Sequence, residues 1–533
     1  MSSSSDTGAV FARKSSGLSR PYTAFDLVVF VIAFTIGSGI LFFTVQVVGE
    51  YPGSNPFLAL LVDIIPLFSG AAVVYLLATA MPRVGGQYVW ISRLLNPGIG
   101  YFVNIFSWIG YCLIMGDVAY IGASFLAQGF TIAGLVTHSS TLSSSGQFFT
   151  HPLNIILVAS LITIIFTILT FFGHTVSRVV VSVLFFIPLV ILLVADIKML
   201  LTPQSSVPSL WNAVFGSGSY NNIYSLSTSK GWTAKLIQPS LSATFLAAIP
   251  LISSWSGFSH FGGWISGETK VPNKTMFFGT IGAGLVALFL MAFTIGSYQH
   301  MYGVEFVSRM SYVSSSLHVT PSIPLLGAVA FGNVGWFAIV ISFIVFLFPI
   351  KDVFPSIIFQ ARQLFGAAFD RMLPMRLLYV SRKTGQPIIS YLVTGIAIII
   401  SIVVVSPYLK LGLFVGADLY VLSIGMLQLF TAIAAIVLPV TNPDLFEKAG
   451  RPANAEIGGI PVISLVGVLS LASWVYLLGD SFFNAFSAKV GLTVMLVISI
   501  IVGLIFLMYI AFMRRLAREG INVSLVGREI PPL

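Results

Sequence analysis

Charged residues are scarce in this chain. Asp, Glu, Lys and Arg together make up 8% of its 533 residues, whereas 57% of the residues are hydrophobic. A typical soluble domain carries about 25% charged residues. The shortage excludes a water-soluble fold, and the chain is predicted to be an all-α polytopic membrane protein.

Cysteine and histidine are also rare. The single cysteine, Cys112, lies inside an apolar run, which excludes an internal disulfide and a cysteine-based metal site. The histidines are mostly scattered near loops without metal-ligand spacing, and no Walker or dinucleotide-binding motif is present. We therefore expect no enzyme activity, no metal and no cofactor.

The N-terminus lacks an apolar leader. Residues 1–23 are rich in serine and contain Arg13, Lys14 and Arg20, which predicts a disordered cytoplasmic tail. The net charge of +9 does not indicate a nucleic-acid partner, because basic residues of a membrane protein set its topology.

Twelve apolar segments are long enough to cross a bilayer, which takes about 20 helical residues. These segments are residues 24–47, 57–80, 99–133, 153–173, 176–201, 241–265, 275–299, 325–350, 388–406, 411–439, 460–480 and 489–513. Most Lys and Arg residues fall on one side of the resulting topology. The positive-inside rule then predicts that both termini are cytoplasmic. We expect a multi-pass protein of the cell (plasma) membrane.

The two longest outer loops, residues 134–152 and 202–240, are polar but poor in charge. The second loop contains aromatic residues that are predicted to be membrane-interface anchors or, alternatively, a lid over the outer mouth: Trp211, Tyr220, Tyr224 and Trp232. On the inner side, Phe359 to Phe365 with Phe369 is predicted to form an amphipathic continuation of the eighth span that lies on the cytoplasmic surface.

Two glycines interrupt the first span. Gly37-Ser38-Gly39 lies near its centre and weakens the helix there. Because lipid satisfies no unpaired backbone group, a break at this depth would line a cavity, as in transporters with discontinuous helices. The alternative is that small residues let a neighbouring helix pack closely.

A second polar interruption lies in the sixth span. Residues 253–263 hold four serines, three glycines, a tryptophan and a histidine. We favour an unwound binding segment over close packing, because packing explains Trp255 and His260 less well. The two breaks lie five spans apart, as expected if spans one to five and six to ten form two inverted repeats.

Four motifs resemble those of the amino acid–polyamine–organocation permeases. Gly37-Ser38-Gly39-Ile40 looks like the glycine-serine-glycine signature of their first span. Residues 82–88 resemble the Pro-Arg-x-Gly-Gly-x-Tyr loop after the second span, and residues 268–272 resemble the Glu-x-x-x-Pro segment after the sixth. Residues 361–374 are similar to the Arg-rich stretch after the eighth span. The match is specific for residues 24 to about 390, whereas the last four spans match by number and hydropathy alone.

The resemblance implies a LeuT-type fold, with two inverted five-helix repeats, discontinuous helices 1 and 6, and two accessory helices. The implied units are the tail (1–23), the first repeat (24–201), an extracellular loop (202–240), the second repeat (241–439), the accessory helices (440–513) and a cytoplasmic tail (514–533). It also implies alternating access around an amino acid held at the midplane.

The broken helices suit an amino acid on physical grounds. A helix that restarts after the first break offers free N–H groups and a positive dipole end to a carboxylate, and open carbonyls in the sixth span would accept from the amino group. Trp255 and Phe258 are candidates for an aromatic gate. The expected substrate contacts are Thr35, Ile36, Gly37, Ser38, Gly39, Ser254, Trp255, Ser256, Gly257 and Phe258.

Two departures from the family concern energy coupling. Many members carry an acidic residue after the sixth-span Gly-Phe pair, where this chain has Ser259 and His260. His260 is either a proton or substrate contact or a histidine hydrogen-bonded within the break. Proton-coupled members often have a fifth-span lysine in place of a sodium ion, but residues 179–188 contain none. Proton and sodium both stay open as the coupling ion.

Ionisable residues inside spans are costly and are therefore functional candidates. Asp117 is the strongest of them, and it would also suit a cationic substrate such as arginine, lysine or a polyamine. Three further positions are weaker candidates: Asp63, Asp418 and the Lys351-Asp352 pair, placed at the inner end of the eighth span. Residues near span ends are expected to reach the interface: Asp26, Asp196 and Lys198.

These features together predict a secondary active amino acid transporter. Its expected partners are a small-molecule substrate and the lipid bilayer, without nucleic acid, and no oligomeric state is specified. The alternatives are an amino acid or polyamine exchanger of the same fold, or a membrane sensor that binds an amino acid without moving it.

Overall fold

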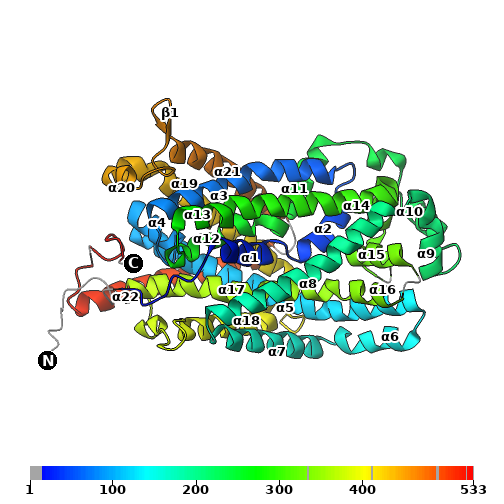
Figure 1. Ribbon diagram of the computed structural model, residues 1–533, viewed down its shortest axis with the longest axis horizontal. Coiled ribbons are helices and arrows are strands. Elements are labelled where there is room, and N and C mark those ends of the chain that lie inside the picture. Colours follow the sequence, from blue (N-terminus) through cyan, green and yellow to red (C-terminus); the bar gives the residue numbers. More distant parts are fainter. Residues whose placement is uncertain are drawn as a thin grey trace.

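In the computed structural model the chain is almost entirely helical (Figure 1). The structure describes residues 15–317, 319–332, 335–409, 412–487, 491–523 and 525–531. Most of the predicted N-terminal tail, residues 1–14, lies outside these ranges, and so do the side chains of Ser38 and Asp418.

Ten of the described helical segments are long and apolar enough to cross a membrane. They are formed by α3 (Pro56–Ala80), α5 (Pro97–Thr137), α7 (Pro152–Thr170), α8 (His174–Leu201), α13 (Pro272–Phe277) continuing into α14 (Ala283–Tyr312), α17 (Ile344–Phe369), α18 (Ile388–Val405), α19 (Gly412–Thr441), α21 (Val462–Ser487) and α22 (Gly491–Arg518). A bent pair, α1 (Ala24–Thr35) and α2 (Ser38–Glu50), makes an eleventh span, and α11 (Leu241–Trp255) is a shorter apolar helix. The all-α polytopic architecture is confirmed, while the inverted-repeat relation of its two halves stays a prediction.

Short elements connect these helices, most of them at the two ends of the bundle (Figure 1). The helices among them are α4 (Gln87–Leu94), α6 (Ser140–Ser145), α9 (Val207–Phe215), α10 (Ser219–Ser229), α12 (Phe261–Trp264), α15 (Ile323–Phe331), α16 (Gly335–Ser342) and α20 (Pro443–Lys448). Strands β1 (Glu456–Ile457) and β2 (Ile460–Pro461) form a small antiparallel hairpin in which Ile457 faces Ile460.

Three spans start at strong local signals. Thr23 and Asp26 form a reciprocal capping box at the start of α1. Asn55 caps α3 and Asn96 caps α5, and in both cases a proline follows at the first helical position, where its missing N–H costs nothing.

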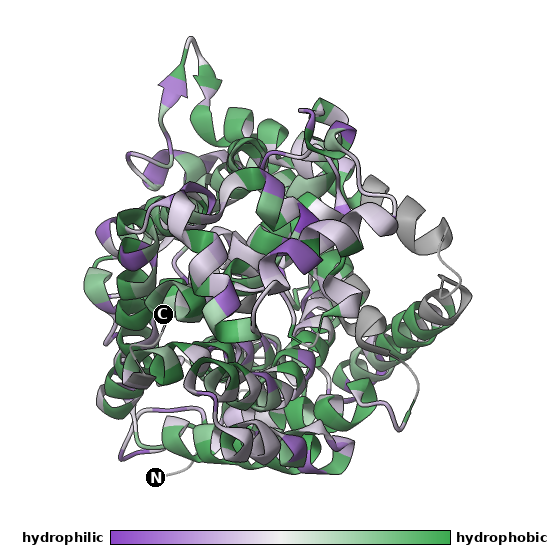
Figure 2. Cartoon of the chain, turned by 90° about the vertical axis from the view of Figure 1, so that its right-hand side faces the viewer, coloured by the Kyte–Doolittle hydropathy of each residue, from purple (hydrophilic) through white to green (hydrophobic). Residues whose placement is uncertain are grey.

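The long helices run roughly along one axis and pack around α5, which contacts α17, α18 and α19 (Figure 1). Seen along this axis, the helices are dominated by hydrophobic residues (Figure 2). Many large apolar side chains on outward faces are exposed, among them Leu161, Ile187 and Phe289. Such a surface suits lipid, which does not penalise exposed apolar groups.

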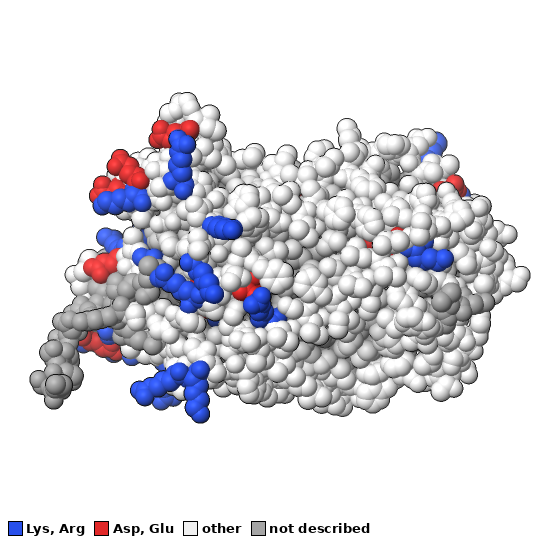
Figure 3. Space-filling model, viewed as in Figure 1, with Lys and Arg blue, Asp and Glu red and all other residues white. Residues whose placement is uncertain are grey.

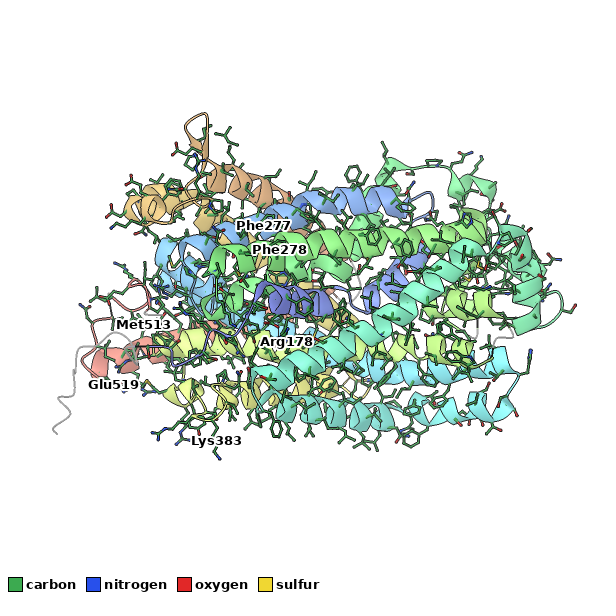
Figure 4. The ribbon with its side chains drawn as sticks, viewed as in Figure 1. Arg178, Phe277, Phe278, Lys383, Met513 and Glu519 are labelled. Carbon is green, nitrogen blue, oxygen red and sulfur yellow. The ribbon has the colours of Figure 1, made fainter. Side chains whose placement is uncertain are left out.

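Charged residues gather at one end of the molecule, on the left in Figure 3. Lys383 and Glu519 lie toward this end (Figure 4), where α22 also terminates (Figure 1). The chain leads into α1 from the same end (Figure 1). The middle of the face shown in Figure 3 carries few charged side chains, as expected for a band facing lipid.

The predicted position of the eighth span is wrong. In its first part, residues 325–331 and 335–342 belong to the two short helices α15 and α16. The helix long enough to span is α17, which continues to Phe369. Phe359 and Phe365, predicted to lie on the cytoplasmic surface, are buried in this helix. Charges and prolines at residues 349–362 suggested a surface segment, but these charges are paired inside the bundle.

The outer loop 202–240 is folded onto α14, and its two tryptophans are buried there rather than exposed as interface anchors. The alternative, a lid over the outer mouth, stays a prediction. Trp211 is buried and its ring contacts Phe306 edge-on, with centroids 5.0 Å apart. Trp232 is also buried, donates from Nε1 to Ser308 Oγ at 3.2 Å, and lies under the Arg309 guanidinium. These contacts hold α9 and the segment after α10 against one end of α14.

Candidate functional site

The first break separates α1 from α2, which are bent by 40° relative to each other. Ile36 and Gly37 leave helical geometry, and Gly37 is the extended N-cap of α2. Gly39 lies so close to α11 that a Cβ atom there would come within 2.0 Å of the Ser254 Cβ. The glycines therefore serve both as a break and as a close helix contact, which unites the two interpretations of the sequence.

The second break follows Trp255, where α11 ends. A 3₁₀ turn, η4 (Ser256–Ser259), and the single helical turn of α12 replace a regular helix. A Cβ atom on Gly257 would come within 2.9 Å of the Phe34 ring and of Thr35 Oγ1, so the turn packs directly on the end of α1. The two breaks thus meet in the interior of the bundle.

A cavity of about 200 Å³ lies where the breaks meet. Its lining includes six of the predicted site residues: Thr35, Gly37, Gly39, Asp117, Ser254 and Gly257. The other lining residues come from α1, α2, α5, α17 and α19: Phe34, Phe43, Ile114, Met115, Val118, Ile121, Asp352, Tyr420 and Val421. The structure therefore brings together residues that are far apart in the sequence around one cavity.

Lys351 and Asp352 form a buried ion pair beside the first break. Lys351 Nζ donates to Asp352 Oδ1 at 2.6 Å and to the carbonyl oxygen of Ala33 at 2.5 Å. It also donates to the carbonyl oxygen of Ile36. The ammonium group thus satisfies carbonyls that α1 leaves without helical partners when it ends.

The Asp352 carboxylate faces the start of α2. A Cβ atom on Gly37 would come within 2.4 Å of Asp352 Oδ2, so only glycine fits here without displacing the carboxylate. A negative charge at this position is favourable, because the first N–H groups of a helix carry a partial positive charge.

Asp117 lies on α5 with its side chain almost fully buried at 4% exposure. It lines the cavity, and its Oδ1 atom has no hydrogen-bond partner among the described residues. Buried carboxylate oxygens are usually hydrogen-bonded, so an unpartnered one at a cavity is a candidate ligand contact.

Three predicted site residues of the second break are not part of the cavity lining. Trp255 donates from Nε1 to Asp63 Oδ2 on α3 at 3.0 Å, and Phe258 packs against Phe68 with ring centroids 5.0 Å apart. Ser256 lies 3.5 Å from the Tyr420 hydroxyl but is not part of the lining. Aromatic lining instead comes from Phe34, Phe43 and Tyr420.

Ile36 and His260 are also placed outside the lining. Ile36 is buried and contributes its carbonyl to Lys351. His260 Nδ1 lies 3.0 Å from Ser259 Oγ, and the His260 carbonyl accepts from Gln87 Nε2 at 2.8 Å. This geometry favours the second of the two interpretations, a histidine hydrogen-bonded within the break.

Two aspartates expected to reach the interface are buried. Asp196 is fully buried and accepts from Thr294 Oγ1 at 2.7 Å and Ser297 Oγ at 3.0 Å, so its predicted access to the interface is wrong. Asp26 caps α1 and pairs with Arg178 of α8, which is labelled in Figure 4, at 2.9 Å.

The remaining sequence motifs meet toward the charged end of α17. Arg362 binds Glu268 through two parallel hydrogen bonds, Nε to Oε1 at 2.8 Å and Nη2 to Oε2 at 2.9 Å, and both residues are buried. Asp370 receives two such bonds from Arg93, at 2.6 and 2.7 Å. These pairs join the segments after the second, sixth and eighth spans.

The same segments also support the sixth-span break. Gly85 N donates to the Trp264 carbonyl at 3.0 Å, and a Cβ atom on Gly86 would come within 2.1 Å of the Gly263 carbonyl oxygen. The two glycines have φ angles of +87° and +33°, which other residues adopt with strain. The loop after the second span thus fits tightly against α12.

The Lys351-Asp352 pair, predicted at the inner end of the eighth span, lies in the first half of α17, beside the first break. The signal that locates it is the apolar run on both sides of the pair, from Ile341 to Ile350 and from Val353 to Phe359. A charged pair flanked this way lies inside a span and needs an interior partner. The partner carbonyls on α1 are more than 300 positions away, so they were beyond any local pattern.

The site agrees with the family evidence. The sequence profile described as "Amino acid permease" matches residues 22–507, which covers nearly the whole chain and includes both breaks and every described cavity-lining residue. No curated protein matches the chain. On this evidence the chain belongs to the amino acid permease family of the amino acid–polyamine–organocation superfamily.

Proposed function

We propose that this permease is a secondary active transporter that moves amino acids across the cell membrane by alternating access. The observation that carries the proposal is the cavity of about 200 Å³ lined by both helix breaks. It is smaller than the roughly 300–1,000 Å³ of pockets for drug-sized ligands, which suits a single amino acid. The clustering of charge at the end where both tails emerge supports cytoplasmic termini.

The substrate carboxylate binds at the start of α2 and the amino group at the end of α11. The N–H groups at the start of α2 and its dipole favour an anion, and the carbonyls that α11 leaves open favour a cation. The Lys351 ammonium balances the charge of Asp352, so that carboxylate repels a substrate carboxylate less than a lone aspartate would.

We further propose that protons rather than sodium ions energise transport. Unwound carbonyls in broken transporter helices commonly bind the coupling ion. Here the carbonyl oxygens of Ala33 and Ile36 already accept hydrogen bonds from Lys351. A sodium ion would have to displace this ammonium group to use the same oxygens.

Uptake into proteoliposomes tests the function. We expect radiolabelled amino acid to accumulate when the pH is lower outside than inside, with equal rates in sodium and potassium buffers. Counterflow without net uptake would instead identify an exchanger. Saturable binding without uptake or counterflow under any gradient would contradict transport and favour the sensor.

A further inference from the structure

The cavity is acidic. The described residues that line it include two aspartates, Asp117 and Asp352, but no lysine, arginine or histidine. A zwitterionic amino acid with an apolar side chain would bring no charge to balance an additional carboxylate. The charge of the lining therefore carries information about the substrate side chain.

Only one of the two carboxylates has a cationic partner. Asp352 pairs with Lys351 at 2.6 Å, and this pair has no net charge. Asp117 forms no ion pair among the described residues, and its Oδ1 atom lacks a hydrogen-bond partner there. A buried carboxylate without a partner is costly, so a cationic ligand would gain from binding next to it.

The surroundings of Asp117 leave few other partners for this carboxylate. Its neighbours on α5 that line the cavity are apolar: Ile114, Met115, Val118 and Ile121. From the facing helices, the ionisable groups in the lining are Asp352 and the Tyr420 hydroxyl. Neither supplies a positive charge, which leaves a cationic group of the substrate as a partner for this carboxylate.

We propose that the substrate is a cationic amino acid, and that Asp117 is the specificity-determining residue that binds the ammonium or guanidinium group of its side chain. The inference rests on the proposed function, because it takes the two helix breaks as the site of the α-carboxylate and α-amino group. All amino acids share the α-carboxylate and α-amino group, and Asp117 then selects among them by the charge of the side chain. A charge-assisted hydrogen bond to a buried carboxylate provides this kind of selection.

The test compares each cationic amino acid with a neutral analogue of similar size. Dissociation constants for lysine, norleucine, arginine and citrulline are measured on the purified full-length protein by ligand-induced thermal shift. The wild type should prefer lysine to norleucine and arginine to citrulline. Asp117→Asn keeps the shape but removes the charge, and should reduce both preferences by about 30-fold, which corresponds to about 2 kcal/mol.

Two further variants separate binding from folding. Asp117→Glu keeps the charge and should retain a preference for lysine. Asp196→Asn is the matched control, because Asp196 is another buried carboxylate in a span, hydrogen-bonded to Thr294 and Ser297 and absent from the cavity lining. It should leave both preferences unchanged. Cadaverine and agmatine, which lack the α-carboxylate, should bind more weakly than lysine and arginine.

The outcomes distinguish this inference from the proposed function. Unchanged preferences in Asp117→Asn, or an equal loss of affinity for all four amino acids, would overturn the role of Asp117. A preference for lysine that depends on Asp117, without any uptake or counterflow in proteoliposomes, would overturn transport and leave the specificity site intact. Equal binding of cadaverine and lysine would overturn the carboxylate contact alone. The absence of binding by all amino acids would overturn both proposals.

Discussion

Replacing Lys351 by methionine removes the ammonium group from the first helix break while keeping an unbranched side chain. The variant loses the ion pair with Asp352 and the two hydrogen bonds to carbonyls of α1. Because Lys351 and Asp352 are both buried, the carboxylate is left in the interior without its partner. Breaking a buried ion pair in this way typically costs about 3–5 kcal/mol.

A double-mutant cycle isolates this cost. Lys351→Met and Asp352→Asn should each lower the unfolding midpoint of the purified protein, measured in detergent by intrinsic fluorescence. The double variant should be more stable than Lys351→Met, because it no longer buries an unpaired carboxylate. Gly503→Leu is a control, since a Cβ atom there meets nothing within 4 Å.

Two results would contradict the proposed role of the Lys351-Asp352 pair. If Lys351→Met is as stable as the wild type, the ammonium group does not hold the break together. If the effects of the two single changes simply add, the two side chains do not interact energetically.

Other predictions concern the cavity, the ion pairs at the charged end, and coupling. Gly257→Leu should abolish amino acid binding in the thermal-shift assay, because its side chain would enter the space held by Phe34 and Thr35, whereas Gly503→Leu should bind normally. Arg93→Met should lower the unfolding midpoint by much more than Arg515→Met, because the Arg93 pair is buried and the Arg515 pair is exposed, and an exposed pair is worth only about 0–1 kcal/mol. Lys351→Met should abolish uptake driven by a pH gradient, and uptake that persists in this variant would contradict its role in coupling.

The membrane fold and the two breaks follow from simple features of the sequence. Apolar segments of spanning length must be helical because lipid offers no partner to backbone groups. Glycines and serines at residues 37–39 and 253–263 mark the places where these helices lose regular geometry. These features depend on local composition, which is why the sequence alone was enough to find them.

The depth of the eighth span was not predictable in the same way. Residues 349–362 contain two prolines and three charged side chains, and such a composition normally marks a surface segment. In the structure, Lys351 pairs with Asp352, and Arg362 pairs with Glu268 of another segment. Tertiary partners thus decide whether charged residues in an apolar context are buried.

The directions of individual side chains also could not be predicted from the sequence. Trp255 and Phe258 belong to the sixth-span break as predicted, but Trp255 turns toward Asp63 because that carboxylate accepts its N–H. The partner is 192 positions away and belongs to α3. A local pattern can locate a break without showing which of its residues face the cavity.

Photo-crosslinking tests directly whether the substrate binds between the two helix breaks. The probe is a diazirine-bearing analogue of lysine, and adducts on the purified protein are mapped by mass spectrometry with and without excess unlabelled lysine. We expect competed adducts within residues 34–43, 114–121, 254–257 or 420–421, which together include most of the cavity lining. Competed adducts confined to the outer loop, residues 202–240, would contradict it.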